Sequence, residues 1–184
     1  MLLGLIGPAA GKWDNDFCAI LSLIFSSGWP WGCYAFAVGY CCRSKIESAL
    51  LASVGLSVGV VAYYAFKDLN PAVPIGEEYV TSSGGPSSMI LLWGIFALVL
   101  GAPVGVIGNL ARMQGFAGLP FRVIAPLIAL CETTMRLDVE SDGQPPAVIV
   151  TWQVVRFAAG VMILALGGHA IWASLRRRRN RSLA

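Results

Sequence analysis

Charged residues are scarce in this sequence. They make up 12% of the 184 residues, whereas about 25% is usual for a soluble domain. Hydrophobic residues make up 57%, and they form near-continuous runs that a soluble core of this size has no means of burying. The composition excludes an ordinary soluble globular protein and predicts an integral membrane protein. The net charge of +3 does not indicate a nucleic-acid partner, because the basic residues concentrate at the C-terminus.

Residues that build most catalytic and metal sites are also few. The sequence has a single histidine, His169, and its five cysteines form no C-x-x-C pair, so the Cys/His cluster of a zinc site is absent. It has no phosphate-binding loop, dinucleotide-binding fingerprint, serine-hydrolase elbow or H-E-x-x-H. These absences argue against an enzyme and identify no catalytic residue, metal or cofactor.

Six apolar runs account for most of the chain. Most of them have the roughly 17–25 residues that a helix needs to cross a hydrocarbon core of about 30 Å. We therefore predict an all-α polytopic membrane helix bundle of about six transmembrane helices, with residues 1–175 as one domain and residues 176–184 as a basic cytoplasmic tail. The first run is too short to span, so either the natural chain starts upstream or this helix is stunted, and we favour the former. The runs lie near residues 1–10, 17–42, 48–66, 89–110, 117–135 and 147–175.

Charges of opposite sign alternate between the connectors that separate these runs. Cytoplasmic loops of membrane proteins carry an excess of lysine and arginine. The alternation therefore predicts that both termini are cytoplasmic and that residues 67–88 and 136–146 lie outside. The basic set is Arg43, Lys45, Arg112, Arg176, Arg177, Arg178, Arg179 and Arg181, and the acidic set is Asp14, Asp16, Asp68, Glu77, Glu78, Asp138, Glu140 and Asp142.

The second apolar run is 26 residues long, and its centre contains the sequence Gly28-Trp29-Pro30. Proline removes a backbone donor and clashes with the preceding turn, so a regular helix should be interrupted within residues 26–32. Two interpretations stay open. The break lies at membrane depth, buried in protein or beside a water-filled cavity. Alternatively, a short outer helix precedes a span that starts at Pro30, with Trp29 and Trp31 as interfacial anchors.

Four polar side chains inside the apolar runs form a candidate functional site: Glu132, Arg156, Gln153 and Asn109. Ionisable groups inside a membrane are costly, face the bundle interior and often mark function. Arg156 lies about nine residues beyond the outer loop, which is too deep for snorkelling alone. We therefore expect Glu132 and Arg156 to form an ion pair in the outer half of the membrane. Arg136 is the competing partner for Glu132, but it can reach water instead.

Glycines at regular spacing in the third and fourth runs are candidates for helix packing. Small residues let membrane helices approach closely, within one chain or between chains, so a homo-oligomer or a partner in a membrane complex is possible. The arginines from Arg176 to Arg181 are expected to anchor the tail at the bilayer and to attract anionic lipids. The packing candidates are Gly55, Gly59, Gly101, Gly105 and Gly108.

Several of these features together resemble a bacterial, largely actinobacterial, family of small multi-pass membrane proteins of unknown function. The resemblance covers most of the chain. It implies six helices, a missing N-terminal piece and a location in the bacterial plasma (inner) membrane, and it supplies no activity. It rests on the Gly/Pro-rich opening run, the stretch from Trp29-Pro30-Trp31 to Gly39, the Tyr63-Tyr64 pair, the run Trp93…Gly101-x-Pro103-x-Gly105-x-x-Gly108…Arg112, and Glu132.

Two functions follow from these features. The first is a small transporter or channel-like protein, in which polar groups of the second, fifth and sixth helices line a cavity. The second is a non-catalytic accessory or structural subunit of a larger membrane complex, which uses its glycine-rich faces to pack against other helices. A hydrated cavity beside Glu132 and Arg156 would favour transport, which we prefer. A dry interior with a lipid-facing groove at Gly55 and Gly59 would favour the subunit.

Overall fold

The computed structural model describes residues 2–13, 15–69, 86–139 and 144–181. In this part of the chain there are seven α-helices, one short 3-10 helix and no strand. The all-α prediction is therefore confirmed. The acidic residues Asp14, Glu77, Glu78, Glu140 and Asp142 lie outside the described residues. The helices are α1 Leu2–Ala10, α2 Asp16–Ser26, α3 Gly28–Cys41, α4 Lys45–Leu69, α5 Pro86–Leu110, η1 Gly115–Gly118, α6 Leu119–Val139 and α7 Pro146–Arg181.

Four of these segments are long and apolar enough to cross a membrane, which makes the protein a multi-pass membrane protein. They are Lys45–Lys67, Ser88–Leu110, Gly115–Val139 and Pro146–Arg176. The expected six spans are thus found only in part. α1 has nine residues, and the long second run is divided into α2 with 11 and α3 with 14. Each of these is shorter than the roughly 20 residues of a single span.

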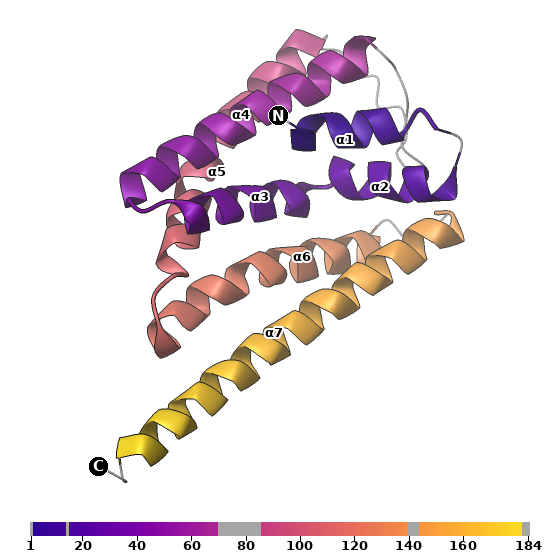
Figure 1. Cartoon of the computed structure of the whole chain (residues 1–184). Coiled ribbons are helices and arrows are strands. Elements are labelled where there is room, and N and C mark those ends of the chain that lie inside the picture. Colours follow the sequence, from indigo (N-terminus) through magenta and orange to yellow (C-terminus); the bar gives the residue numbers. More distant parts are fainter. Residues whose placement is uncertain (1, 14, 70–85, 140–143, 182–184) are drawn as a thin grey trace.

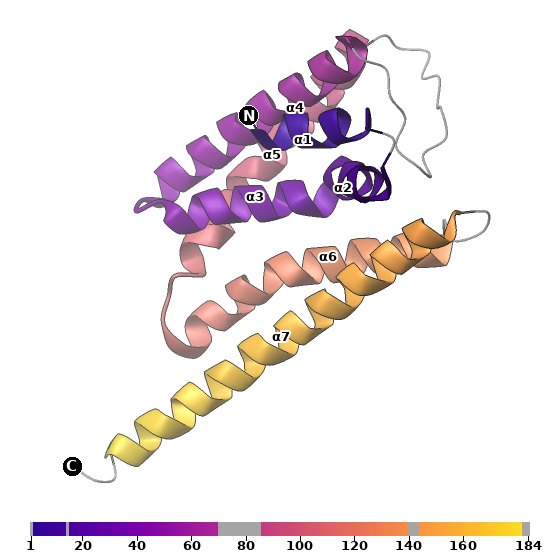
Figure 2. The same cartoon turned by 45° about the vertical axis from the view of Figure 1, so that its right-hand side comes forward.

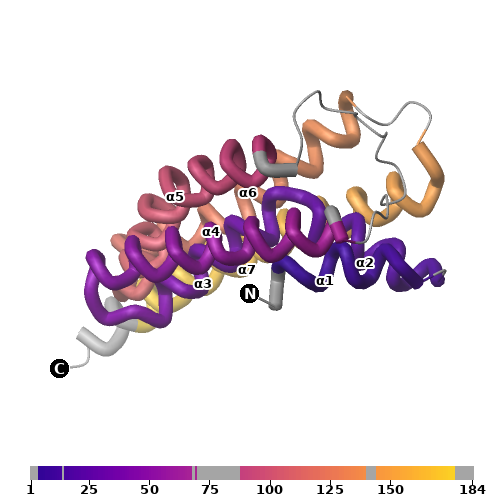
Figure 3. The backbone as a smooth tube through the Cα atoms, turned by 90° about the horizontal axis from the view of Figure 1, so that it is seen from above, coloured from indigo at the N-terminus to yellow at the C-terminus, as the bar shows by residue number. Residues whose placement is uncertain are grey.

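The chain runs back and forth between two ends of the molecule (Figures 1 and 2). The α3–α4 turn, the α5–α6 turn and the C-terminal end of α7 lie at one end, and the end of α1, the starts of α2 and α7 and the end of α6 lie at the other. Seen from above, the helix axes lie broadly along one common line, although the chain direction alternates (Figure 3). The basic residues Arg43, Lys45 and Arg112 therefore lie at the opposite end from Asp16 and Asp138.

The centre of the bundle is built from small residues on α3, α4 and α5. Its buried members are Ala35, Ala52, Leu56 and Ala97. Glycines let the backbones touch here: a Cβ on Gly105 would clash with the carbonyl oxygen of Ser48 on α4, and a Cβ on Gly39 would clash with the carbonyl oxygen of Gly105. α3, α4 and α5 thus pack at backbone distance, as small residues permit in membrane helices.

All five glycines expected to serve in helix packing lie against other helices of the same chain. A Cβ on Gly101 would lie 2.7 Å from the Cα of Ser53, and one on Gly108 would meet the carbonyl oxygen of Phe36. On α4, Gly55 faces Tyr34 and Gly59 faces Trp31, both of α3. Gly4 of α1 also lies against the backbone of Gly59. The Gly55/Gly59 face is therefore filled from within and is no lipid-facing groove.

α6 and α7 form an antiparallel hairpin that packs on the rest of the molecule only over part of its length (Figure 1). Near the α6–α7 connector, Trp152 and Val148 of α7 are buried against Leu23 of α2. Beyond Ala159 no α7 residue with a described side chain is buried, and a Cβ on Gly160 would have no neighbour within 4 Å. The C-terminal half of α7 therefore extends away from the bundle (Figures 1 and 2).

Candidate functional site

The second apolar run is broken where its sequence predicts a break. α2 ends at Ser26, α3 begins at Gly28, and Ser27 between them is extended, with φ −83° and ψ 163°. Pro30 is the third residue of α3, a position in the first turn where its missing N–H is not needed. In a continuous helix its ring would clash with the carbonyl of Ser26, so the chain leaves the helical path just before it.

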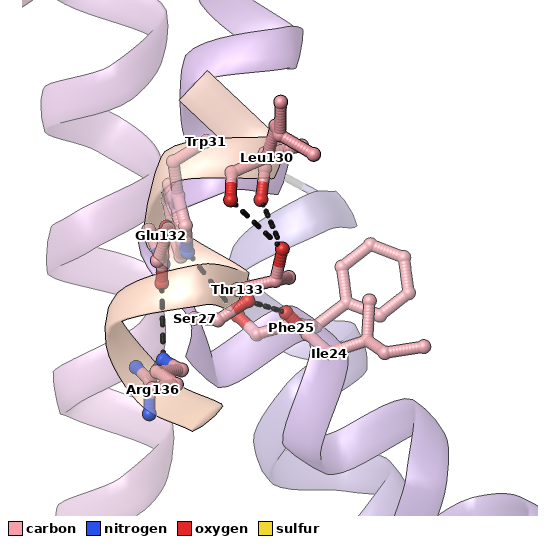
Figure 4. Close-up of polar contacts among 10 residues, drawn as sticks. Ile24, Phe25, Ser27, Trp31, Leu130, Glu132, Thr133 and Arg136 are labelled. Carbon is pink, nitrogen blue, oxygen red and sulfur yellow. Dashed lines mark hydrogen bonds and ion pairs between the residues drawn. The ribbon is translucent and has the colours of Figure 1, made fainter. Parts of the chain in front are cut away.

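The carbonyl groups that α2 frees at the break are bound by neighbouring side chains (Figure 4). The Ser27 amide and hydroxyl both donate to the carbonyl oxygen of Ile24, at 3.1 and 2.5 Å. The Trp31 indole Nε1 donates to the carbonyl oxygen of Phe25 at 3.1 Å. Irregular backbone inside a membrane is tolerated when the protein satisfies its polar groups. The fold therefore stabilises the break by supplying hydrogen-bond donors to the carbonyl groups that it frees.

Glu132 of α6 caps the other side of the break. Its Oε1 atom accepts a hydrogen bond from the backbone N–H of Gly28 at 2.9 Å. Ser27, the N-cap residue of α3, makes no side-chain capping bond, so a residue 104 positions away performs this role. A carboxylate is favoured here because the N-terminus of a helix carries a partial positive charge. Glu132 therefore ties α6 to the start of α3.

Arg136 completes this site on the α6 side. Its Nε lies 3.3 Å from Oε1 of Glu132, one turn earlier on the same helix (Figure 4). Its guanidinium group also stacks over Trp152 of α7, 5.1 Å from the ring centroid. The side chains of Glu132 and Arg136 are 22% and 23% exposed, so the pair lies at the surface of the bundle. Three helices, α3, α6 and α7, therefore meet at one partly accessible ion pair.

Trp29 adds an unused donor beside the break. Its ring packs against the cluster of Leu23, Val148 and Trp152. Its Nε1 atom is buried and has no acceptor in the part of the chain that the structure describes. A cavity of about 30 Å³, large enough for a water molecule, lies close by between α2 and α7. It is lined by Asp16, Ala19, Ile20, Leu23, Ala147 and Val148.

The expected ion pair between Glu132 and Arg156 is wrong. Glu132 binds Gly28 and Arg136 instead, and Arg156 has no carboxylate within 4.0 Å among the described residues. Arg136 pairs with Glu132 in preference to Arg156 because it lies four residues from Glu132 on the same helix, where the two side chains meet whatever the tertiary packing. Arg156 is only partly buried, one turn beyond Trp152, and Gln153 is exposed, so neither belongs to the site.

Asn109 serves the opposite end of α3. Asn109 Nδ2 and Arg112 Nη1 both donate to the carbonyl oxygen of Cys42, at 2.7 Å each. Cys42 is the C-cap residue of α3, where carbonyl groups lack helical partners and cations are favoured. α3 is therefore held at its start by Glu132 and at its end by α5. Asn109 has a structural role at a distance from Glu132.

Sequence reasoning placed Ser27 within the predicted break and named Arg136 only as a competing partner of Glu132, and it did not identify Trp152. The spacing of Glu132 and Arg136 by four residues was a usable signal. Nothing in the sequence places Trp152 beneath Arg136, because that contact depends on how α6 and α7 pack. The described residues contain no group of three or more His, Cys, Asp or Glu side chains that could hold a metal ion.

Comparison with protein-family models, with curated proteins and with solved structures finds no match to this chain. The function must therefore be argued from the site itself.

Proposed function

We propose that this chain is a small membrane transporter in which the broken helix α2–α3 is the moving element and Glu132 is its polar anchor. α2 and α3 together form a fifth crossing, and α1 forms part of a sixth. In keeping with the resemblance to a bacterial family, the protein resides in the plasma membrane with both termini in the cytoplasm. The capped break at Ser27 carries the proposal.

A broken helix held by an acidic side chain is a common design in transporters. Discontinuous membrane helices place helix ends where they can bind polar or charged substrates. Their backbone is irregular only where it is buried in protein or lines a cavity. Here the start of α3 meets a partly exposed carboxylate, Glu132. Intramembrane carboxylates of this kind mark ion and substrate pathways.

The contacts of α3 hold it in the bundle, so movement at the break falls to α2. The start of α3 is tied to α6 by the Glu132–Gly28 bond, and its end is tied to Asn109 of α5 and to Arg112 just beyond α5. The extended residue Ser27 gives α2 and α3 independent directions, and Figure 2 shows α2 turned out of the line of α3. Release of Glu132 from Gly28 would free the backbone at Ser27, so that α2 could swing away from α3 and expose the break. Such an opening is what alternating access requires.

The second candidate is an accessory subunit of a membrane complex. One observation favours it: most of the described side chains in the C-terminal half of α7 are exposed, and a Cβ on Gly160, Gly167 or Gly168 would meet open space. In a complex, a partner helix would cover this half. An accessory subunit needs no opening at Ser27, so the two functions differ in what they predict there.

A cysteine at the break tests the transporter. The variant Ser27→Cys is made in a chain whose native cysteines are replaced by alanine. Ser27 is 1% exposed in this structure, so a cysteine at this position reaches water only if the break opens. We expect a water-soluble thiol reagent to modify Ser27→Cys in reconstituted vesicles, because transport opens the break. The readout is the fraction of protein modified with time.

Ser48→Cys is the matched control. Ser48 is also a buried serine, 0% exposed, but it lies in α4 away from the break. We expect it to stay unmodified under the same conditions. If Ser27→Cys is protected as fully as Ser48→Cys, the break does not open and the accessory-subunit function takes the place of the transporter.

A further inference from the structure

A second surface, far from the break, lies near the end of α7. The rings of His169 and Trp172 are 6.2 Å apart between centroids, and the guanidinium group of Arg176 stacks over Trp172 at 5.4 Å from its centroid. The three residues are spaced by three and four, so they lie on one face of the helix. All three are exposed, and Trp172 is 57% exposed. We call these three residues the α7 ridge.

The α7 ridge does not face the rest of the chain. The described residues of α7 that are buried are Val148, Thr151, Trp152 and Ala159. At 3.6 residues per turn the centre of the ridge lies about a quarter of a turn away from the centre of that face. The neighbouring residues Ile171 and Leu175 are also largely exposed. The medium around the ridge is therefore the bilayer.

Helix length places the ridge at the level of the lipid headgroups. The apolar segment Pro146–Arg176 has 31 residues, which is about 46 Å at 1.5 Å per residue. A bilayer with its headgroups is about 40–45 Å thick, and the hydrocarbon core is about 30 Å. With Pro146 at one interface, Trp172 and Arg176 lie at the other. Tryptophan and arginine are favoured at this depth, where a ring meets acyl chains and a cation meets phosphate.

We propose that the α7 ridge binds the headgroup of one anionic phospholipid, with Arg176 on the phosphate and Trp172 against the upper acyl chain. Charge complementarity identifies the occupant. Arg176 begins a run of arginines that continues to Arg181, and Arg43, Lys45 and Arg112 lie at the same end of the bundle. This end repels a second copy of itself and attracts anionic lipid. The proposal is independent of transport.

A specific lipid site at the ridge and a diffuse attraction of lipid by the basic tail predict different effects when single arginines are replaced. Arg176→Gln and Arg181→Gln remove the same charge. Arg176 stacks on Trp172, whereas Arg181 lies five residues further along α7. Diffuse attraction is worth about fivefold in lipid association for one arginine near an anionic surface. We expect Arg176→Gln to lose more than about fivefold in preference for phosphatidylglycerol over phosphatidylcholine, and Arg181→Gln to lose no more than this diffuse contribution.

The experiment uses the full chain reconstituted in vesicles of phosphatidylcholine with trace spin-labelled phosphatidylglycerol or phosphatidylcholine. The readout is the relative association constant of the two labelled lipids. Trp172→Leu should lower the phosphatidylglycerol preference as Arg176→Gln does. Trp93→Leu is its control, because Trp93 is likewise exposed, at 48%, but lies on α5.

Each outcome decides the proposal. Equal losses for the two arginine variants would show diffuse attraction by the tail and overturn the site. A loss for Trp93→Leu equal to that of Trp172→Leu would show a general effect of interfacial tryptophan and also overturn it. Unchanged preference in all variants, or a dimer that excludes labelled lipid from the ridge, would assign this face to another occupant.

Discussion

Glu132 shows how one side chain can serve as an end cap for a helix that is far away in sequence. Its carboxylate accepts from the Gly28 amide and from Arg136, so it satisfies a donor that the break would leave bare. Gly28 is exposed, so the contact is best compared with an ordinary helix N-cap, which is worth about 0.5–2 kcal/mol. The partly exposed ion pair with Arg136 contributes about 1 kcal/mol or less.

We predict a graded loss of stability at this residue. Glu132→Leu should lower the free energy of unfolding in detergent by about 0.5–2 kcal/mol, the usual cost of removing a helix N-cap. Glu132→Gln should lose less, because its amide oxygen can still accept from Gly28. Thermal unfolding followed by tryptophan fluorescence measures both. Equal losses would show that charge, rather than the Gly28 bond, is what matters.

A double-mutant cycle separates the two candidate partners of Glu132. Glu132→Leu combined with Arg156→Leu should give additive losses within about 0.5 kcal/mol, because residues without a shared contact do not couple. Glu132→Leu combined with Arg136→Leu should be less harmful than the sum of the single changes. Denaturant titration of the three single and two double variants measures the coupling. Coupling to Arg156 in place of Arg136 would contradict the contacts described above.

At the scale of helices, glycine decides how closely α3, α4 and α5 pack. Gly105 touches the Ser48 carbonyl on α4 and lies against Gly39 on α3, so one residue joins three helices. Gly94, on the same helix, has no neighbour within 4 Å. The two glycines share a helix and differ only in what surrounds them. A comparison of substitutions at Gly105 and Gly94 therefore distinguishes the effect of packing on stability from that of helix propensity.

We predict that Gly105→Ala destabilises the protein by about 1–3 kcal/mol, the usual cost of forcing a methyl group into a packed contact. Gly94→Ala should cause no loss, because alanine is the better helix former where space is open. Thermal unfolding in the same detergent measures both. A loss of similar size for Gly94→Ala would mean that the close approach at Gly105 does not control stability.

At the scale of the whole molecule, the alternation of charge becomes a spatial separation. The turns that hold Arg43, Lys45 and Arg112 lie at one end of the bundle, and Asp16 and Asp138 lie at the other. The positive-inside bias then orients the molecule as a whole, because all basic turns would have to cross together for it to invert.

Cysteine labelling tests this orientation. In the cysteine-free chain, Asp138→Cys should react with a membrane-impermeant reagent in intact cells, because the positive-inside rule predicts that the acidic end faces outward. Ser44→Cys, in the α3–α4 turn, should react only after the cells are made permeable. Both positions are exposed, so access depends on the side of the membrane alone. The reverse pattern would place the termini outside.

The sequence by itself determined the membrane class, the all-α fold and the position of the helix break. These depend on properties that are local in the chain: the length of apolar runs, the alternation of charge and the missing N–H of Pro30. It did not establish the six spans, because α1, α2 and α3 are each too short to qualify alone. Whether α2 and α3 act as one crossing depends on their neighbours.

The tertiary structure alone decided the partner of Glu132 and the use of the glycines. Which carboxylate reaches which donor depends on the rotation of α6 against α3, and helix periodicity fixes only the face within one helix. The same holds for Gly55 and Gly59, whose face is covered by Trp31, Tyr34 and α1. Short-range interactions along the chain determine where the helices begin and end. The partners of side chains across helices depend on how the helices pack, and no single stretch of sequence specifies that packing.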